Sequence, residues 1–252
     1  MEFKDHFSTQ ASDYARFRPR YPAELFEWLA DVAPAHRCAW DAGTGNGQCA
    51  VALAARFERV VATDPSAAQL AAAETHASVS YRCERAEAPT LDDGEADLVT
   101  VAQALHWFDV PTFSAAAARV LAPGGVLAVW CYEVFATAPA IDAVVSHFYH
   151  HVIGPYWPPE RRHIESGYAG LVLPFERIPT PSLALAVDWP LDALVGYLGT
   201  WSATARYRTA TGQDPIPAVH DALHAVWGDA ATPRRVQWPL TIHACRKPRG
   251  DR

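Results

Sequence analysis

The chain has 252 residues, of which 50% are hydrophobic and 19% are charged, a balance typical of a soluble globular protein. Its formal net charge of −7 disfavours a nucleic-acid partner, because phosphate binding depends on Lys and Arg. Five separated cysteines without a CxxC pair disfavour a zinc site or a disulfide framework. They fit a reducing cytoplasm, and no apolar run suits a membrane partner.

Short apolar runs alternate with alanine-rich runs from residue 35 to residue 131, which predicts alternating strands and helices. We expect helices over 22–29, 48–57, 66–75 and 113–121, and strands over 37–41, 59–63, 79–81, 97–101 and 125–130. Ser66 is the expected N-cap of its helix, and Pro123-Gly-Gly125 is expected to end the helix before it. Continuous apolar strands separated by helices predict a parallel sheet that is covered on both faces.

The pattern changes after residue 131, where aromatic residues, His and Pro become frequent. Residues 133–182 predict an insertion that packs over the carboxyl edge of the sheet. The strand pattern returns at 183–187, helices are expected over 191–198 and 217–227, and a last strand over 236–245. We expect the two late strands to form an antiparallel pair.

A single domain is therefore predicted for residues 1–252. Its expected parts are an N-terminal helical lid (1–34), a cofactor-binding core (35–132), a cap insertion (133–182) and the C-terminal part of the sheet (183–252).

The run Asp41-Ala-Gly-Thr-Gly-Asn-Gly47 joins the first expected strand to the next helix. A strand, a Gly-rich turn and a helix N-terminus together suit a nucleotide-like ligand. Glycines also serve any tight turn, so the glycine pattern alone is weak evidence. Asp64 strengthens it, because an acid at the end of the second strand can accept hydrogen bonds from both ribose hydroxyls.

Two residues separate this turn from a dinucleotide site. Gln48 stands where the pattern G-x-G-x-x-G requires its third glycine. The carboxylate of Asp41 would repel a pyrophosphate, whereas it would attract the ammonium of an amino acid, directly or through water. The ligand implied is a nucleoside that carries an amino acid, which is S-adenosylmethionine (SAM).

These motifs resemble those of class I SAM-dependent methyltransferases. Residues 41–47 look like their motif I, and residues 63–66 look like their second, acidic motif. Residues 85–87 resemble the segment after the third strand that contacts the adenine. Residues 96–107 resemble the fourth motif, and residues 119–126 resemble the turn from the helix to the fifth strand. Residues 7–22, 106–109 and 156–162 are similar to the type 11 branch, which includes trans-aconitate methyltransferase-like and cantharidin-resistance-type small-molecule enzymes. The resemblance implies an α/β fold: a Rossmann-like three-layer αβα sandwich with a helical cap. Its seven-stranded, mostly parallel sheet would have the order 3-2-1-4-5-7-6 and an antiparallel last strand.

The resemblance also implies a set of cofactor contacts. Tyr14 and Arg18 would fold over the cofactor from the N-terminal helix, and Arg18 would pair with the methionine carboxylate. The alternative for Arg18 is a surface corner that fixes the start of the next helix. The full expected set is Tyr14, Arg18, Asp41, Gly43, Thr44, Gly45, Gln48, Asp64, Pro65, Ser66, Gln69, Ala86, Glu87, Gln103 and Ala104.

His106 is the candidate general base, because it follows the fourth strand beside the expected methyl position and a free imidazole titrates near neutral pH. The alternative makes His106 part of a pocket wall, since alignment alone can accelerate methyl transfer. Arg161 and Arg162 suit a substrate carboxylate, and the alternative for them is a solvated helix start. Expected acceptor contacts are Trp107, Tyr156, Trp157, Arg161, Tyr168 and Trp201.

The sequence thus predicts a SAM-dependent enzyme that methylates a small molecule, at an oxygen nucleophile such as a carboxylate or a hydroxyl. The alternatives are an NAD-linked Rossmann oxidoreductase and a non-catalytic SAM-binding protein. We expect no metal site at His150 and His151, because neighbouring helical residues diverge. Both a monomer and a homodimer remain open.

Overall fold

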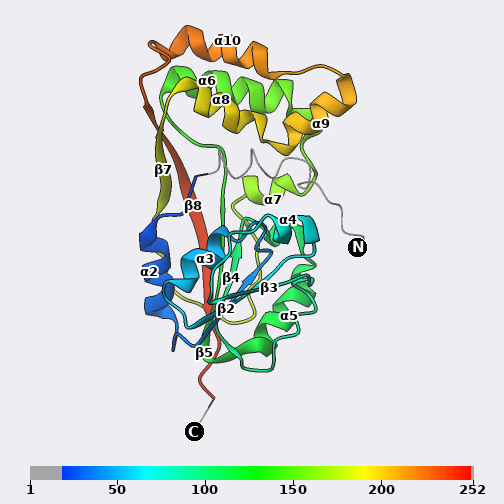
Figure 1. Ribbon diagram of the computed structural model, residues 1–252, viewed down its shortest axis with the longest axis vertical. Helices are drawn as coiled ribbons and strands as arrows, with labels where there is room; N and C mark the ends of the chain where they lie inside the picture. The colour runs from blue at the N-terminus through cyan, green and yellow to red at the C-terminus, as the bar shows by residue number, and fades with distance from the viewer. Residues whose placement is uncertain (1–18, 251–252) are drawn as a thin grey trace.

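Five parallel strands form most of the sheet in the computed structural model, which describes residues 19–250 (Figure 1). The strands are β1 (Cys38–Ala42), β2 (Arg59–Thr63), β3 (Val79–Arg82), β4 (Ala96–Ala102) and β5 (Leu121–Tyr132). The strands β1, β2, β4 and β5 are almost completely buried and mostly apolar, as expected for strands covered on both faces, whereas the edge strand β3 is only partly buried. The observed order is β3-β2-β1-β4-β5-β8-β6.

The last strand, β8 (Arg234–Arg246), runs antiparallel to β5 and takes the place of the predicted seventh strand. The two-residue β6 (Glu176–Arg177) pairs with its end and takes the sixth place. The α/β fold class and the antiparallel last strand beside β5 are therefore confirmed. The sheet has eight strands and not seven, and the strand expected over 183–187 does not take the sixth place, because it pairs with the other half of β8.

The first half of β8 has a different partner, the strand β7 (Ala184–Trp189). Residues 234–239 of β8 pair with β7, and residues 240–246 pair with β5, because β5 ends at Tyr132. The predicted antiparallel pair of late strands is confirmed. It extends as a ribbon past the carboxyl edge of the sheet toward the helices above it (Figure 1).

Four helices flank the parallel strands: α2 (Ala23–Val32), α3 (Gln48–Ala54), α4 (Ala67–Ala71) and α5 (Val110–Val120). Ser66 caps α4 as predicted, because its side chain accepts a hydrogen bond from the backbone N–H of Gln69. The helix predicted over 113–121 begins earlier, since Asp109 provides an N-cap by accepting from the N–H of Thr112. Both α3 and α4 are shorter than predicted.

A second group of helices covers the carboxyl ends of the strands. It comprises α6 (Pro139–His147), the turns η3 (Phe148–Val152) and η4 (Gly154–Tyr156), α7 (Arg161–Glu165), α8 (Leu191–Gly199), α9 (Ser202–Thr211) and α10 (Ile216–Trp227). Figure 1 shows α6, α8 and α10 stacked as one layer. Two chain segments, one on each side of β7, thus build this helical layer.

Large aromatic side chains join the helical layer to the sheet. Trp130 on β5, Trp238 on β8 and Trp227 on α10 are fully buried in one cluster. The indole N–H of Trp238 donates to the hydroxyl of Tyr197 on α8 at 3.2 Å. This packing fixes the distance between the sheet edge and the layer above it. No helix within residues 19–250 is both long and apolar enough to cross a membrane.

Candidate functional site

The Gly-rich turn lies at the carboxyl end of β1, against the neighbouring β2. The backbone N–H groups of Gly43 and Thr44 both donate to the carbonyl of Thr63, at 2.8 and 3.0 Å. Gly43 has φ +71°, and a Cβ there would lie 2.6 Å from the Cβ of Ala104. Only glycine therefore fits this position, for reasons of both conformation and space.

Asp41 is completely buried at the base of the turn. Its two carboxylate oxygens accept hydrogen bonds from the hydroxyls of Thr44, at 2.6 Å, and Thr100, at 2.8 Å. Burial raises the pKa of Asp41, and the two hydroxyls oppose this effect. Asp41 thus ties β1, the turn and β4 together, and its contact with a cofactor ammonium stays a prediction.

Asp64 follows β2 and faces the tip of the turn. It accepts hydrogen bonds from the backbone N–H groups of Gly45 and Ser66, each at 2.9 Å. Among residues 19–250, a Cβ on Gly45 would meet only the Gln69 side chain, at 3.9 Å, so the described part of the chain leaves room for a ligand beside Gly45. A carboxylate beside an accessible backbone is the combination that a ribose and its substituent require. These residues fit SAM.

The other predicted cofactor residues are distributed around this turn. Glu87 accepts a hydrogen bond from the backbone N–H of Asp109 at 2.9 Å, and Ala86 is buried beside it. Gln48 donates to the carbonyl of Pro19 at 3.2 Å, and the carbonyl of Pro65 accepts from the thiol of Cys83. Tyr14 and Arg18 lie outside the described residues.

Gln103 links the carboxyl ends of β4 and β5. Its backbone has φ +55°, uncommon for a residue with a side chain. Its amide donates to the carbonyl of Tyr132 at 3.0 Å and accepts from the N–H of Tyr132 at 3.3 Å. Two bonds to one backbone residue hold this strand end in a fixed conformation, next to a cavity.

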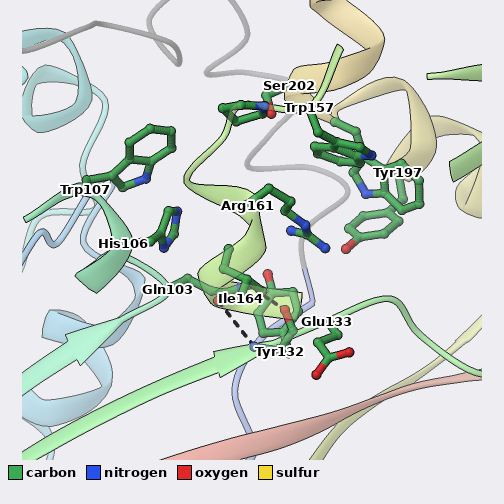
Figure 2. Close-up of a pocket in the computed structure, with 12 residues that line it drawn as sticks. Gln103, His106, Trp107, Tyr132, Glu133, Trp157, Arg161, Ile164, Tyr197 and Ser202 are labelled. Atoms are coloured by element: carbon green, nitrogen blue, oxygen red, sulfur yellow. Dashed lines mark hydrogen bonds between the residues drawn. The ribbon is translucent and has the colours of Figure 1, made fainter. Parts of the chain in front are cut away.

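That cavity lies between the carboxyl ends of β4 and β5 and the helices above them (Figure 2). It encloses about 670 Å³, which includes open solvent at its mouth. We call it the acceptor pocket. Its lining residues come from four separate parts of the chain: Gln103, His106, Trp107, Tyr132, Glu133, Trp157, Pro158, Arg161, Ile164, Tyr197, Trp201 and Ser202.

Four of the six predicted acceptor contacts line this pocket: Trp107, Trp157, Arg161 and Trp201. Tyr168 lies buried behind His106, and Tyr156 packs against Tyr207 with ring centroids 5.1 Å apart. Tyr132 and Glu133 were not predicted, although their place at the end of the fifth strand was a usable signal. Pro158 was not predicted either, although it directly follows Trp157, and no local signal points to Ile164, Tyr197 or Ser202.

His106 is held in the wall of the pocket by Tyr168. Its Nδ1 lies 3.1 Å from the Tyr168 hydroxyl. Burial lowers the pKa of His106 to about 3, and the positive charges of Arg161 and His163 contribute. The imidazole is therefore neutral at neutral pH and has a low affinity for a proton. This environment favours the wall interpretation over the general-base interpretation.

Arg161 lines the pocket, whereas its neighbour Arg162 is exposed to solvent. The Arg161 Cζ lies 4.8 Å from the ring centroid of Trp157, which is a cation–π contact. Figure 2 shows Arg161 reaching from α7 toward the side of the pocket where Tyr197 lies. Within residues 19–250, Arg161 is thus the one arginine that lines this pocket.

Trp157 brings a second polar group close to the pocket. Its indole N–H is buried without a hydrogen-bond partner in the described part of the chain. A buried donor without a partner is costly, so an acceptor atom of a bound ligand would stabilise it. Over residues 19–250 no cluster of His, Cys, Asp and Glu has the arrangement of a metal site.

Comparisons with known proteins agree with this geometry. The family model for a methyltransferase domain matches residues 40–129. A protein of Dictyostelium discoideum that is named as a methyltransferase is 34% identical over 226 residues, which are 88% of this chain and 86% of that protein. One of Mycobacterium tuberculosis, also named as a methyltransferase, is 39% identical over 130 residues, about half of each chain.

A solved structure from Anaeromyxobacter dehalogenans, described as that of a type II methyltransferase, is also similar. It is 46% identical in sequence, with a TM-score of 0.87. The match covers 92% of this chain and 99% of the other. The similarity therefore extends over most of the chain and is not confined to the residues around the cofactor turn.

Proposed function

Because the chain belongs to the class I SAM-dependent methyltransferases, we propose that it methylates a small organic acid at a carboxylate oxygen. The observation that carries this proposal is the placement of Arg161 in an aromatic-walled pocket. The membership in the type 11 branch of small-molecule enzymes stays a prediction.

The cofactor half of the site is assigned to residues around the Gly-rich turn. Asp64 is the group for the ribose hydroxyls, the free side of Gly45 admits the nucleoside, and Glu87 with Ala86 lies on the adenine side. When bound, SAM supplies a methyl group that is already electrophilic because it is carried on a sulfonium. The chain itself must then bind an acceptor, align it and exclude water.

The acceptor half combines the guanidinium of Arg161 and the carboxylate of Glu133 with a mostly aromatic wall. A guanidinium presents parallel N–H groups that match the two oxygens of a carboxylate. Trp157 and Trp201 offer flat apolar surfaces for the body of the acid. Together they favour a small acid with an apolar or aromatic body.

A carboxylate is favoured over a hydroxyl because His106, the candidate base beside the fourth strand, has a low affinity for a proton. A carboxylate is ionised at neutral pH and needs no base, whereas a hydroxyl usually must lose its proton. His106, the residue placed for that role, has a pKa lowered to about 3. Alignment alone contributes about 7–11 kcal/mol to the lowering of a reaction barrier, which suffices for a proximity mechanism.

The experiment that tests this proposal is a transfer screen with matched acceptors. Purified protein and SAM are incubated with aryl carboxylic acids, the corresponding primary amides, phenols and thiols, and release of S-adenosylhomocysteine is measured. We expect turnover with one or more acids and none with their amides. Turnover confined to phenols or thiols would contradict the carboxylate assignment. Protein that binds SAM but methylates none of these acceptors would contradict the proposed acceptor class.

A further inference from the structure

Arg161 is held by two side chains outside the pocket lining, Tyr149 and Glu165. Its Nε donates a hydrogen bond to the Tyr149 hydroxyl at 2.8 Å. That hydroxyl donates in turn to Glu165 Oε1 at 2.5 Å. Tyr149 has a single hydroxyl proton, which it donates in the hydrogen bond to Glu165. The phenolic oxygen therefore accepts the hydrogen bond from Arg161.

The three residues come from neighbouring turns of one short segment. Tyr149 lies in the π-helical turn η3, and Arg161 and Glu165 begin and end α7, where positions four apart face the same side. The Tyr149 ring is buried, with the ring of Trp157 at 4.9 Å. Burial also raises the pKa of Tyr149, so the hydroxyl keeps the proton that it donates to Glu165.

This arrangement restricts which face of the guanidinium is available. Nε is occupied by Tyr149, and the flat side of the group lies over Trp157. Its two outer amino groups, Nη1 and Nη2, have no hydrogen-bond partner within residues 19–250, so they form the fork that a ligand of the pocket can reach. An oxyanion can then bind end-on, through both outer nitrogens, but not side-on through Nε.

We propose that Tyr149 and Glu165 are positioning residues that hold Arg161 for an end-on, two-point grip on a carboxylate of the acceptor. The inference rests on the proposed function, since it deepens the assignment of the acceptor pocket. Because the Arg161 side chain is already fixed before the acceptor binds, binding has less side-chain conformational freedom to remove. It also gives the acid a single orientation relative to the cofactor turn.

Glu165 has a further effect on the charge of the pocket. Its carboxylate partly compensates the Arg161 charge through the Tyr149 hydroxyl, without forming an ion pair with Arg161 itself. The guanidinium therefore keeps both outer nitrogens for the ligand. A direct ion pair with Glu165 would have occupied the fork that the acceptor needs.

The test is NMR of the arginine Nε–H groups in the whole protein, with benzoate as the probe. Exposed Arg162 is the internal control. In the wild type we expect the Arg161 Nε–H to exchange at least about tenfold more slowly than that of Arg162, because it is hydrogen-bonded and shielded. Tyr149→Phe should abolish this protection, and Glu165→Gln should reduce it. Tyr156→Phe, a nearby tyrosine outside the network, should leave it unchanged.

Benzoate titrations complete the experiment. Benzoate should shift the Arg161 signal in the wild type. In Tyr149→Phe the same shift should need an about tenfold higher benzoate concentration, a change equivalent to the loss of one charge-assisted hydrogen bond. Unprotected Arg161 in the wild type, no response to benzoate, or unchanged binding in both Tyr149→Phe and Glu165→Gln would each overturn the inference. If benzoate binds through Arg161 as expected, yet no acid is methylated, the proposed function fails and the positioning role stands.

Discussion

The cofactor turn and the acceptor pocket lie at the same edge of the sheet but are built in different ways. The turn is local: Asp41 on β1, Gly45 after β1 and Asp64 after β2 come from two neighbouring strand ends and act through short side chains and backbone groups. The pocket is non-local, because its wall combines the ends of β4 and β5 with α7 and α8. The difference suggests that the cofactor and the acceptor are recognised by separable parts of the molecule.

The two regions also differ in electrostatics. Carboxylates dominate around the turn, and each is satisfied by backbone N–H groups or hydroxyls. The pocket carries the guanidinium of Arg161 among aromatic rings, beside a neutral His106 and with the exposed carboxylate of Glu133 in its lining. A positively charged cofactor and a negatively charged acceptor are the partners that these two environments favour. Four variants test whether the regions are separable.

The largest effect is expected from Gly43→Ala in the cofactor turn. Its Cβ would lie 2.6 Å from Ala104 at φ +71°, so the turn must move, and SAM affinity should fall by about 10²-fold or more. Calorimetric titration with SAM measures this loss. Gly212→Ala is the matched control, because Gly212 has φ +69° but no neighbour within 4 Å among residues 19–250. Equal SAM affinity in the two variants would contradict the close approach at Gly43.

A loss nearly as large, but in the other region, is expected from Arg161→Ala. Because the substitution removes a charged hydrogen-bonding group, it should raise the KM for the carboxylic acid acceptor by about 50-fold. The Kd for SAM should stay within about twofold, because additivity holds for sites without shared partners. Steady-state kinetics with varied acid, beside a SAM titration, measures both. The exposed Arg162→Ala is the control, and an equal effect of the two variants would contradict the assignment of Arg161.

An intermediate effect is expected from Asp64→Asn. The amide keeps the size of the side chain but loses its charge and one of its two acceptor oxygens, so SAM affinity should fall by about tenfold. The acid KM at saturating SAM should be unchanged. Asp188→Asn, an exposed ion-pair position on β7, serves as the control in the same titration. If Asp64→Asn changes the acid KM and not the SAM affinity, the two regions are not separable as described.

The smallest effect concerns His106 and pH. Since its folded pKa is about 3, below the ordinary 6.5, His106 is neutral throughout the range near neutrality, and turnover should vary by less than about twofold between pH 5.5 and 8. His106→Gln should retain this flat profile. An inflection near pH 6.5 that disappears in His106→Gln would establish the general-base role instead.

The same shift has a consequence for stability. A depressed folded pKa means that neutral His106 contributes stability that is fully present above about pH 6.5 and is lost as the pH falls toward 3. Urea unfolding at pH 4 and pH 7 should therefore show a smaller acid-induced loss in His106→Gln than in the wild type. An equal loss in the two proteins would contradict the lowered pKa.

The sequence predicted the cofactor region more completely than the acceptor region, for a physical reason. Alternating apolar strands, the Ser66 cap and the pairing of the late strands depend on residues that are close in sequence or follow a regular pattern. The change of partner along β8 depends on where β5 ends, which local patterns do not reveal. Helix α9 was also missed.

Within the pocket, the same rule holds residue by residue. Trp157 and Arg161 were predicted as acceptor contacts because they lie close together in one aromatic and basic run of the sequence. Tyr197 and Ser202 belong to helices that reach the pocket only after the helical layer is packed on the sheet. The hold of Tyr149 and Glu165 on Arg161 likewise depends on the π-helical turn, whose geometry was not predicted.

The most direct test of the central claim is transfer of an isotopically labelled methyl group from SAM to an aryl carboxylic acid, followed by mild alkaline hydrolysis. A carboxyl methyl ester releases labelled methanol under these conditions, whereas methyl ethers, amines and thioethers do not. We expect a labelled product whose label is lost completely on hydrolysis. A labelled product that resists alkali, or no labelled product from any acid, would contradict methylation at a carboxylate oxygen.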